Sequence, residues 1–194
     1  MTGTPRHPVV THPDWLNRLG LVNGPQLLSW RVIKLIPAVA FTKHRGNVVG
    51  ALWKIVLFVG AVEALAGTRR ALAAFVATSV AGYLVAYLAI ARPPAALGHA
   101  WGRIWFHAGD LGSSAGCYGA GIVLAHLLPA PWRWLTLGGP LLSVLTTLHP
   151  DRAPSIWDVE HARALACGLR LGVWWRRSAP VARGVALALQ PGPS

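Results

Sequence analysis

The chain has 194 residues, of which 54% are hydrophobic and only 12% are charged. Soluble globular domains carry about a quarter charged residues, so this composition excludes an ordinary soluble fold and predicts an integral membrane protein. The formal net charge is +12, but the basic residues are scattered between apolar runs and form no basic face. This pattern argues against nucleic-acid binding and favours contact with membrane lipid.

Residues 1–29 form a polar segment punctuated by Pro and Gly, with no apolar run of the kind that follows the basic residues of a signal peptide. Residues 30–41 are apolar but carry Arg31 and Lys34, and they are too short to cross a bilayer, so we expect them at the membrane interface. The membrane domain is expected over residues 30–176. A basic, Pro-containing tail follows over residues 177–194.

Five apolar stretches, each near the lower length limit for a transmembrane helix, follow along the chain. They are Val48–Ala66, Ala71–Ala91, Leu111–Leu128, Trp132–Leu148 and Val159–Trp175. Tryptophans gather at their edges, as in the aromatic belt of membrane proteins. The sequence therefore predicts an all-α, polytopic membrane bundle with five spans.

Arginines mark alternate ends of these stretches. Arg69 and Arg70 follow the first, Arg133 follows the third, and Arg176 and Arg177 open the tail. The positive-inside rule places these ends in the cytoplasm, together with the C-terminus. The third and fifth stretches then begin at the outer face, and a bacterial plasma membrane is the expected location.

The third stretch contains a G-x-S-x-G match with Ser114 at its centre. Ser114 and His161 are expected at the same depth, near the starts of two spans that run in the same direction. An imidazole within hydrogen-bond reach would activate the serine hydroxyl as a nucleophile. Tyr118, one turn after Ser114, lies on the same helical face and can fix the imidazole ring. Backbone N–H groups around Gly112 and Ser113 are placed to hold an oxyanion.

A packing seam without chemistry is the competing interpretation of these residues. Gly112 and Gly116 form a G-x-x-x-G pair, and the fifth stretch presents a similar face of small residues. These are Ala162, Ala164, Ala166, Gly168 and Gly172. The nucleophile elbow of soluble hydrolases needs a preceding strand, which the sequence lacks. The spacing of Cys and His matches no metal site, so neither a metal nor a cofactor is expected.

These motifs resemble those of the rhomboid family of intramembrane serine proteases, over about residues 30–175. The match to the family's fourth helix consists of Gly112, Ser114, Tyr118 and Gly119. The match to its sixth helix consists of His161, Gly168 and Gly172. The match to its second helix consists of His44, Asn47, Gly60, Glu63 and Gly67. The resemblance implies a Ser114/His161 dyad without an aspartate, with Tyr118 packed on His161. It also implies transmembrane protein substrates.

The chain departs from the family in two respects. It offers five spans where six are usual, and Gly50 and Lys54 stand where the second helix normally supplies the histidine and asparagine that hold the oxyanion. Lys54 either extends toward a water-filled cavity or replaces the asparagine as an oxyanion donor. Two functions therefore stay open, a rhomboid-like protease and an inactive rhomboid-like protein that binds transmembrane clients. A small transporter, using Lys54, Glu63 and Arg163, lacks the internal repeat that would support it.

Overall fold

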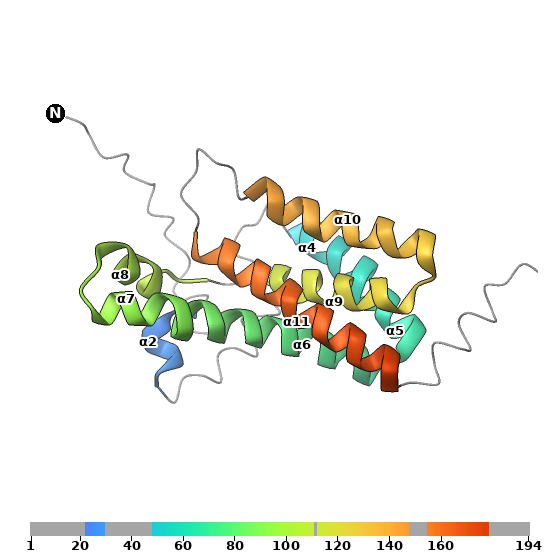
Figure 1. The fold of residues 1–194 in the computed structure, drawn as a ribbon, viewed down its shortest axis with the longest axis horizontal. Helices are drawn as coiled ribbons and strands as arrows, with labels where there is room; N and C mark the ends of the chain where they lie inside the picture. Colours follow the sequence, from blue (N-terminus) through green and yellow to red (C-terminus); the bar gives the residue numbers. More distant parts are fainter. Residues whose placement is uncertain (1–21, 30–47, 111, 148–154, 179–194) are drawn as a thin grey trace, which may run out of the picture.

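The structure is a computed structural model that describes residues 22–29, 48–110, 112–147 and 155–178 (Figure 1). Within these residues the protein is all-helical, as the sequence predicts. The single backbone pairing of strand type among them is an isolated bridge between Val22 and Asp110. The expected interfacial stretch 30–41, together with His44 and Asn47, lies outside the described residues.

The helices follow one another along the chain. They are α2 (Gly24–Leu27), α4 (Val48–Lys54), η3 (Ile55–Gly60), α5 (Ala61–Ala66), α6 (Thr68–Leu84), η4 (Val85–Ala91), α7 (Arg92–Ala96), α8 (Ala100–His107), α9 (Ser114–Leu127), α10 (Ala130–Thr147) and α11 (Ile156–Ser178). The segments η3 and η4 are π-helical turns. Each lies within a continuous helix, α4–η3–α5 and α6–η4–α7.

Each of the five apolar stretches overlaps at least one helix of the described residues. Two of the continuous helices are long and apolar enough to cross a membrane, Val49–Ala66 and Thr68–Ala96. The helix Ser114–Leu127 is apolar but shorter. The structure therefore confirms the all-α class and two candidate membrane helices, while the full set of five spans stays a prediction.

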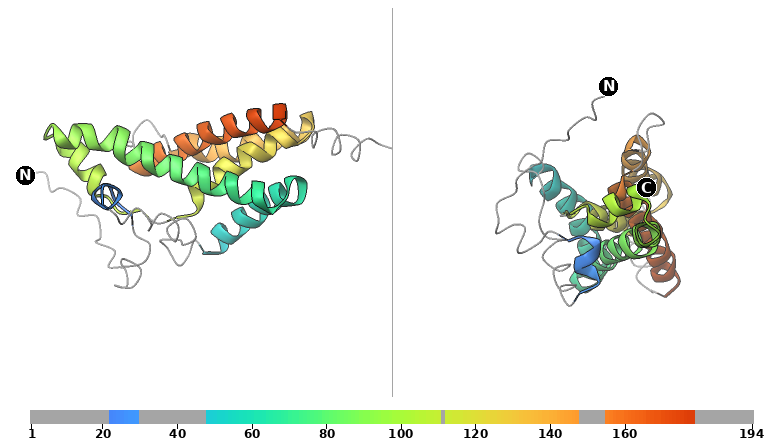
Figure 2. Two further views of the ribbon diagram at one scale, coloured as in Figure 1. Left: turned by 90° about the horizontal axis from the view of Figure 1, so that it is seen from below. Right: turned by 90° about the vertical axis from the view of Figure 1, so that its left-hand side faces the viewer.

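Helix α9 runs through the centre of the bundle, with α6, α10, α11 and the α4–α5 helix around it (Figures 1 and 2). Every residue from Ala115 to Ala125 is buried. A helix that is buried on all sides needs no polar face, which explains why this segment is apolar throughout. It also needs small side chains, because four neighbours must approach its backbone.

Glycines provide that close approach between α9 and α11. A side chain at Gly168 would collide with the backbone of Gly119, whose Cα lies 3.0 Å from the Cβ position. Ala164 and Gly172 are also buried, whereas Ala162 and Ala166 are exposed. The predicted packing face of the fifth stretch is therefore confirmed at three of its five positions, those spaced four residues apart.

Helices α9 and α11 run parallel, as contacts between their two starts and between their two ends show. Ser114 contacts His161 near the two starts. Near the two ends, a side chain at Gly172 would meet the ring of His126 at 2.7 Å. The two helices are therefore in register along most of their length.

The N-terminal segment packs on the bundle where it is described. Val22 and Leu27 are buried against Tyr83, Tyr87 and Ile156. The side-chain oxygen of Asn23 accepts a hydrogen bond from the Gln26 N–H at 3.1 Å and so caps α2. Val22 and Leu27, from the segment that the sequence marks as polar, thus belong to the core of the helical bundle.

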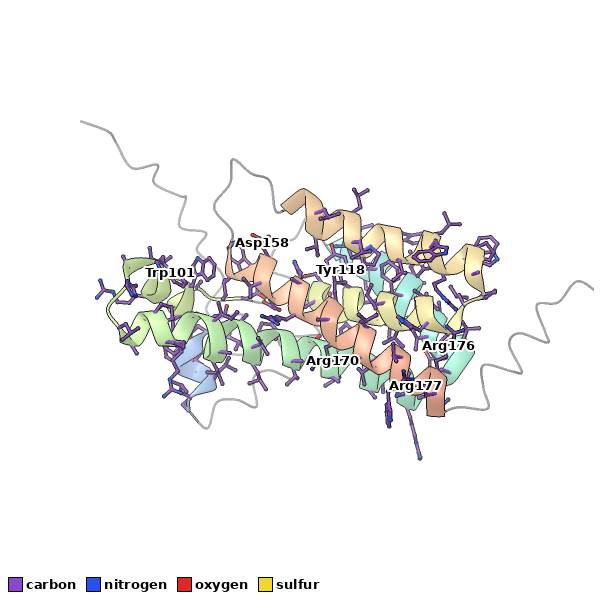
Figure 3. The ribbon with its side chains drawn as sticks, in the orientation of Figure 1. Trp101, Tyr118, Asp158, Arg170, Arg176 and Arg177 are labelled. Atoms are coloured by element: carbon purple, nitrogen blue, oxygen red, sulfur yellow. The ribbon has the colours of Figure 1, made fainter. Side chains whose placement is uncertain are left out.

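Arginines gather at one end of the bundle. Figure 3 shows Arg176 and Arg177 at one end and Trp101, on α8, at the other. An apolar cluster that includes Ala71, Leu124 and Trp175 brings the start of α6 to the ends of α9 and α11. The arginines that flank these helix ends, and so gather at one end of the bundle, are Arg69, Arg70, Arg133, Arg176 and Arg177.

Candidate active site

Ser114 and His161 meet between α9 and α11. Ser114 is the first residue of α9, and its Oγ lies 2.7 Å from Nε2 of His161, in the second turn of α11. Both side chains are half-buried. The distance fits a hydroxyl that donates to a neutral imidazole, which is the arrangement of an activated serine nucleophile.

Tyr118 holds the imidazole from the side. Its ring centroid lies 5.1 Å from that of His161, with the two ring planes at 76°. Tyr118 is buried one turn along α9 from Ser114. An edge-to-face contact of this kind restricts rotation of the imidazole and keeps Nε2 directed at the serine.

Lys54 reaches this site from α4. Its Nζ donates a hydrogen bond to the Tyr118 hydroxyl at 3.2 Å and lies 5.0 Å from the centroid of the same ring. The ammonium group is thus directed into the bundle, toward Tyr118. Three helices therefore contribute to one connected set of side chains: Lys54 from α4, Ser114 and Tyr118 from α9, and His161 from α11.

Backbone donors at the start of α9 lie beside the Ser114 hydroxyl. The first hydrogen bond of α9 runs from the Cys117 N–H to the Ser113 carbonyl at 3.0 Å, so the N–H groups of residues 114–116 have no acceptor within the helix. The positive end of the helix dipole adds to their effect on an anion. A side chain at Gly112 would lie 3.7 Å from the Ser114 Oγ, and the glycine leaves that space open.

Asp158, three residues before His161, binds Ser155 at the start of α11. Its carboxylate accepts hydrogen bonds from the backbone N–H and the hydroxyl of Ser155, both at 2.7 Å. This arrangement caps the start of α11 and favours a negative charge there. Asp158 therefore fixes the first turn of the helix that carries His161.

Other residues singled out from the sequence lie away from this site. A side chain at Gly50 would meet nothing within 4 Å, and Arg163 is exposed. Glu63 accepts a hydrogen bond from the Thr68 hydroxyl at 2.7 Å, at the junction of α5 and α6. His126 bonds the Ile122 carbonyl at 2.9 Å, near the opposite end of α9 from Ser114.

Sequence reasoning missed three residues beside the site, namely Tyr83, Asp110 and Glu160. Glu160 is buried and directly precedes His161. Asp110 precedes Ser114 by four residues. The signal that could have found the two acids is the rarity of acidic side chains in apolar segments, where an ionisable residue is a functional candidate by default. No such signal marks Tyr83.

The described residues contain no group of three or more His, Cys, Asp or Glu side chains placed to hold a metal ion. Comparison with known protein families, with curated proteins and with solved structures finds no match for this chain. The chemical character of the site therefore rests on the geometry of Ser114, His161, Tyr118 and Lys54.

Proposed function

We propose that this protein is a rhomboid-like intramembrane serine protease, with Ser114 as the nucleophile and His161 as the general base. The observation that carries the proposal is the 2.7 Å contact between the serine hydroxyl and the imidazole. A serine that only allows two helices to pack needs no imidazole in line with its oxygen. A serine nucleophile does need such a base, because its hydroxyl is weakly reactive alone.

The same geometry supports acyl transfer. Ser114 Oγ attacks the scissile carbonyl while His161 takes its proton, and the imidazolium then returns the proton to the leaving amine. In this proposal the oxyanion binds to the N–H groups at the start of α9, which have no acceptor within the helix. Water then attacks the acyl-enzyme, with His161 again acting as the base.

The proposal includes a membrane bundle of five spans. Large apolar side chains are exposed on the outer faces of α4 and α10, among them Leu52, Trp53, Leu135 and Leu145, as lipid contact requires. The arginine-rich end fits the cytoplasmic side and the C-terminus with it. The substrate is then a transmembrane segment that unwinds locally, because an intact helix keeps its carbonyls hydrogen-bonded.

A fluorophosphonate probe tests the dyad directly. We expect it to label the purified protein in detergent, and mass spectrometry to place the adduct on Ser114. The His161→Ala variant should react at least about 100-fold more slowly, because it lacks the base. Arg163→Ala, an exposed position two residues along the same helix, is the matched control.

Two results would count against the proposal. Equal labelling of wild type and His161→Ala would show that the imidazole does not activate the serine. Absence of labelling in wild type, under conditions that mark an active rhomboid protease, would favour the inactive protein that binds transmembrane clients.

Lys54 provides a second test of the site. We propose that its ammonium group, held beside Tyr118, assists the oxyanion in place of the missing asparagine. Lys54→Met should lower kcat about 100-fold, the usual effect of losing one oxyanion donor, with expression unchanged. Leu52→Met, an exposed position on the same helix, is the control. Unchanged turnover in Lys54→Met would remove Lys54 from the mechanism.

A further inference from the structure

The connection between α8 and α9 leads directly to Ser114, and the helix that it enters has no side-chain cap among the described residues. Helix α8 ends at His107, and Ala108 after it is extended, with φ −61° and ψ 124°. Ser113 precedes α9 but makes no side-chain hydrogen bond that caps it. The first N–H groups of a helix have no partner within it, so contacts of the residues before α9 determine how firmly its start is held.

Two tyrosines of the long helix α6–η4 bind backbone carbonyls of this connection. The Tyr87 hydroxyl donates to the Ala108 carbonyl at 2.8 Å, and the Tyr83 hydroxyl donates to the Gly112 carbonyl at 3.4 Å. Both tyrosines are fully buried, and a buried hydroxyl needs a partner of this kind. The connection is therefore tied to α6–η4 at two points.

The spacing of the tyrosines matches the spacing of the carbonyls. Residues four apart on a helix lie on one face, and the rings of Tyr83 and Tyr87 are stacked, with centroids 6.4 Å apart and planes at 19°. Ala108 and Gly112 are also four residues apart. Because the later tyrosine binds the earlier carbonyl, the connection runs back along α6–η4 toward the start of α9.

The N-terminal segment binds the same connection. Val22 and Asp110 exchange two backbone hydrogen bonds, both at 2.9 Å, and Asp110 lies midway in sequence between the two carbonyls that the tyrosines bind. The Val22 side chain is 1% exposed and packs in one apolar cluster with Tyr83 and Tyr87. Val22 thus holds the connection through its backbone and the tyrosines through its side chain.

Helix α2 anchors Val22 in this position. A side chain at Gly24 would collide with the ring of Phe106 on α8, so α2 lies directly against that helix. It also contacts η4, and Leu27 at its end is buried in the same apolar cluster. Figure 1 shows α2, in blue, at the end of the bundle that carries α7 and α8.

We propose that Val22, Tyr83 and Tyr87 form a clamp on the connection between α8 and α9, and that this clamp holds the start of α9 in position for the reaction. Its effect on turnover rests on the proposed function, whereas its effect on the connection does not. The three are positioning residues, because they act on the connection rather than on the reacting atoms. A looser clamp lets Ser114 shift relative to His161, and small shifts between reacting groups are costly.

Two buried valines separate the clamp from a general contribution to stability. Val22 is 1% exposed and Val62, on α5, is 0% exposed. Val62 belongs to a different apolar cluster, which includes Ala71 and Trp175. Val22→Ala and Val62→Ala remove the same atoms from the core, so both should lower the thermal midpoint. Only Val22→Ala should lower kcat, about tenfold and with KM within about twofold of wild type, when the full chains cleave a transmembrane substrate in proteoliposomes.

Amide hydrogen exchange tests the clamp without proteolysis, in a Ser114→Ala background. The Asp110 N–H donates to the Val22 carbonyl and reports on the connection, while the Cys117 N–H donates to the Ser113 carbonyl and reports on the start of α9. Val22→Ala should speed the exchange of both amides about tenfold, because the connection opens more readily. Its matched valine control should leave both at the wild-type rate.

Tyr87→Phe is the gentler test, since it removes only the hydroxyl that binds Ala108 and keeps the buried ring. It should also speed the exchange of the Asp110 and Cys117 amides about tenfold. Ser79→Ala is its control, because Ser79 lies on the same continuous helix and its buried hydroxyl has no hydrogen-bond partner among the described residues. The control should exchange at the wild-type rate.

Several results would overturn the clamp. One is wild-type exchange at Asp110 in both Val22→Ala and Tyr87→Phe. Another is faster exchange at Asp110 but not at Cys117, or equal exchange in Val22→Ala and Val62→Ala. Wild-type kcat despite faster exchange would also remove the positioning role. If wild type neither cleaves nor labels, the proposed function fails, and the exchange experiment still decides whether the clamp holds the start of α9.

Discussion

Replacing Ser114 with Ala should abolish both fluorophosphonate labelling and cleavage of a transmembrane substrate. The expected loss in kcat is at least about 10³-fold, since removing a serine nucleophile leaves only the contribution of oxyanion binding and orientation. The fold should persist, because Ala is a good helix former and the small side chain keeps the start of α9 intact. Circular dichroism and the thermal midpoint of the variant should match those of wild type.

Ser79→Ala is the matched control for this experiment. Ser79 is a buried serine on α6. It faces Gly116 on α9, the helix that also carries Ser114. Its hydroxyl has no hydrogen-bond partner among the described residues, so its removal leaves no partner unsatisfied. Ser79→Ala should therefore cleave at the wild-type rate. Residual cleavage in Ser114→Ala equal to that of Ser79→Ala would show that another group performs the chemistry.

The matching depth of Ser114 and His161 is predictable from the sequence for a physical reason. Membrane helices rise by a constant amount per residue, and alternate spans run in the same direction, so the depth of a side chain can be counted from the start of its span. The same counting places Tyr118 one turn from Ser114. The structure has both contacts, with the Ser114 oxygen 2.7 Å from His161 and the two rings 5.1 Å apart.

Contacts that depend on which helices lie side by side are not predictable in this way. The sequence places Lys54 within its span but does not show that α4 packs beside α9. The contact between Lys54 and Tyr118 at 3.2 Å therefore cannot be predicted from it. The hydrogen bonds from Tyr83 and Tyr87 to the loop before Ser114 are hidden for the same reason. Asp110 belongs to a loop whose path is set by tyrosines on α6 and η4, and tyrosines are common in an apolar segment.

The predicted length of the third span also differs from the structure, with consequences for the site. The apolar stretch begins at Leu111, whereas helix α9 begins at Ser114. Hydropathy marks the part of a chain that avoids water, but it does not show where backbone hydrogen bonding starts. The later start puts Ser114 at the helix N-terminus, where N–H groups without an acceptor within the helix can serve an oxyanion.

Gly168→Val should separate α9 from α11 and disable the site from a distance. The Cβ position at Gly168 collides with the backbone of Gly119, and a backbone yields far less than a flexible side chain does. Overpacking of this kind costs about 1–3 kcal/mol in stability. The larger effect should be on kcat, with a loss of about 100-fold, because a shift of about 1 Å between reacting groups is enough to cause it.

The matched control is Gly138→Val on α10, where a side chain would meet nothing within 4 Å. Both variants place the same β-branched residue in a helix, so the intrinsic helix propensity changes equally and cancels in the comparison. Gly168→Val alone should lower the thermal midpoint and slow fluorophosphonate labelling. Equal behaviour of the two variants would mean that the α9–α11 contact is loose. In that case the proximity of Ser114 and His161 could not depend on the glycines that line this seam.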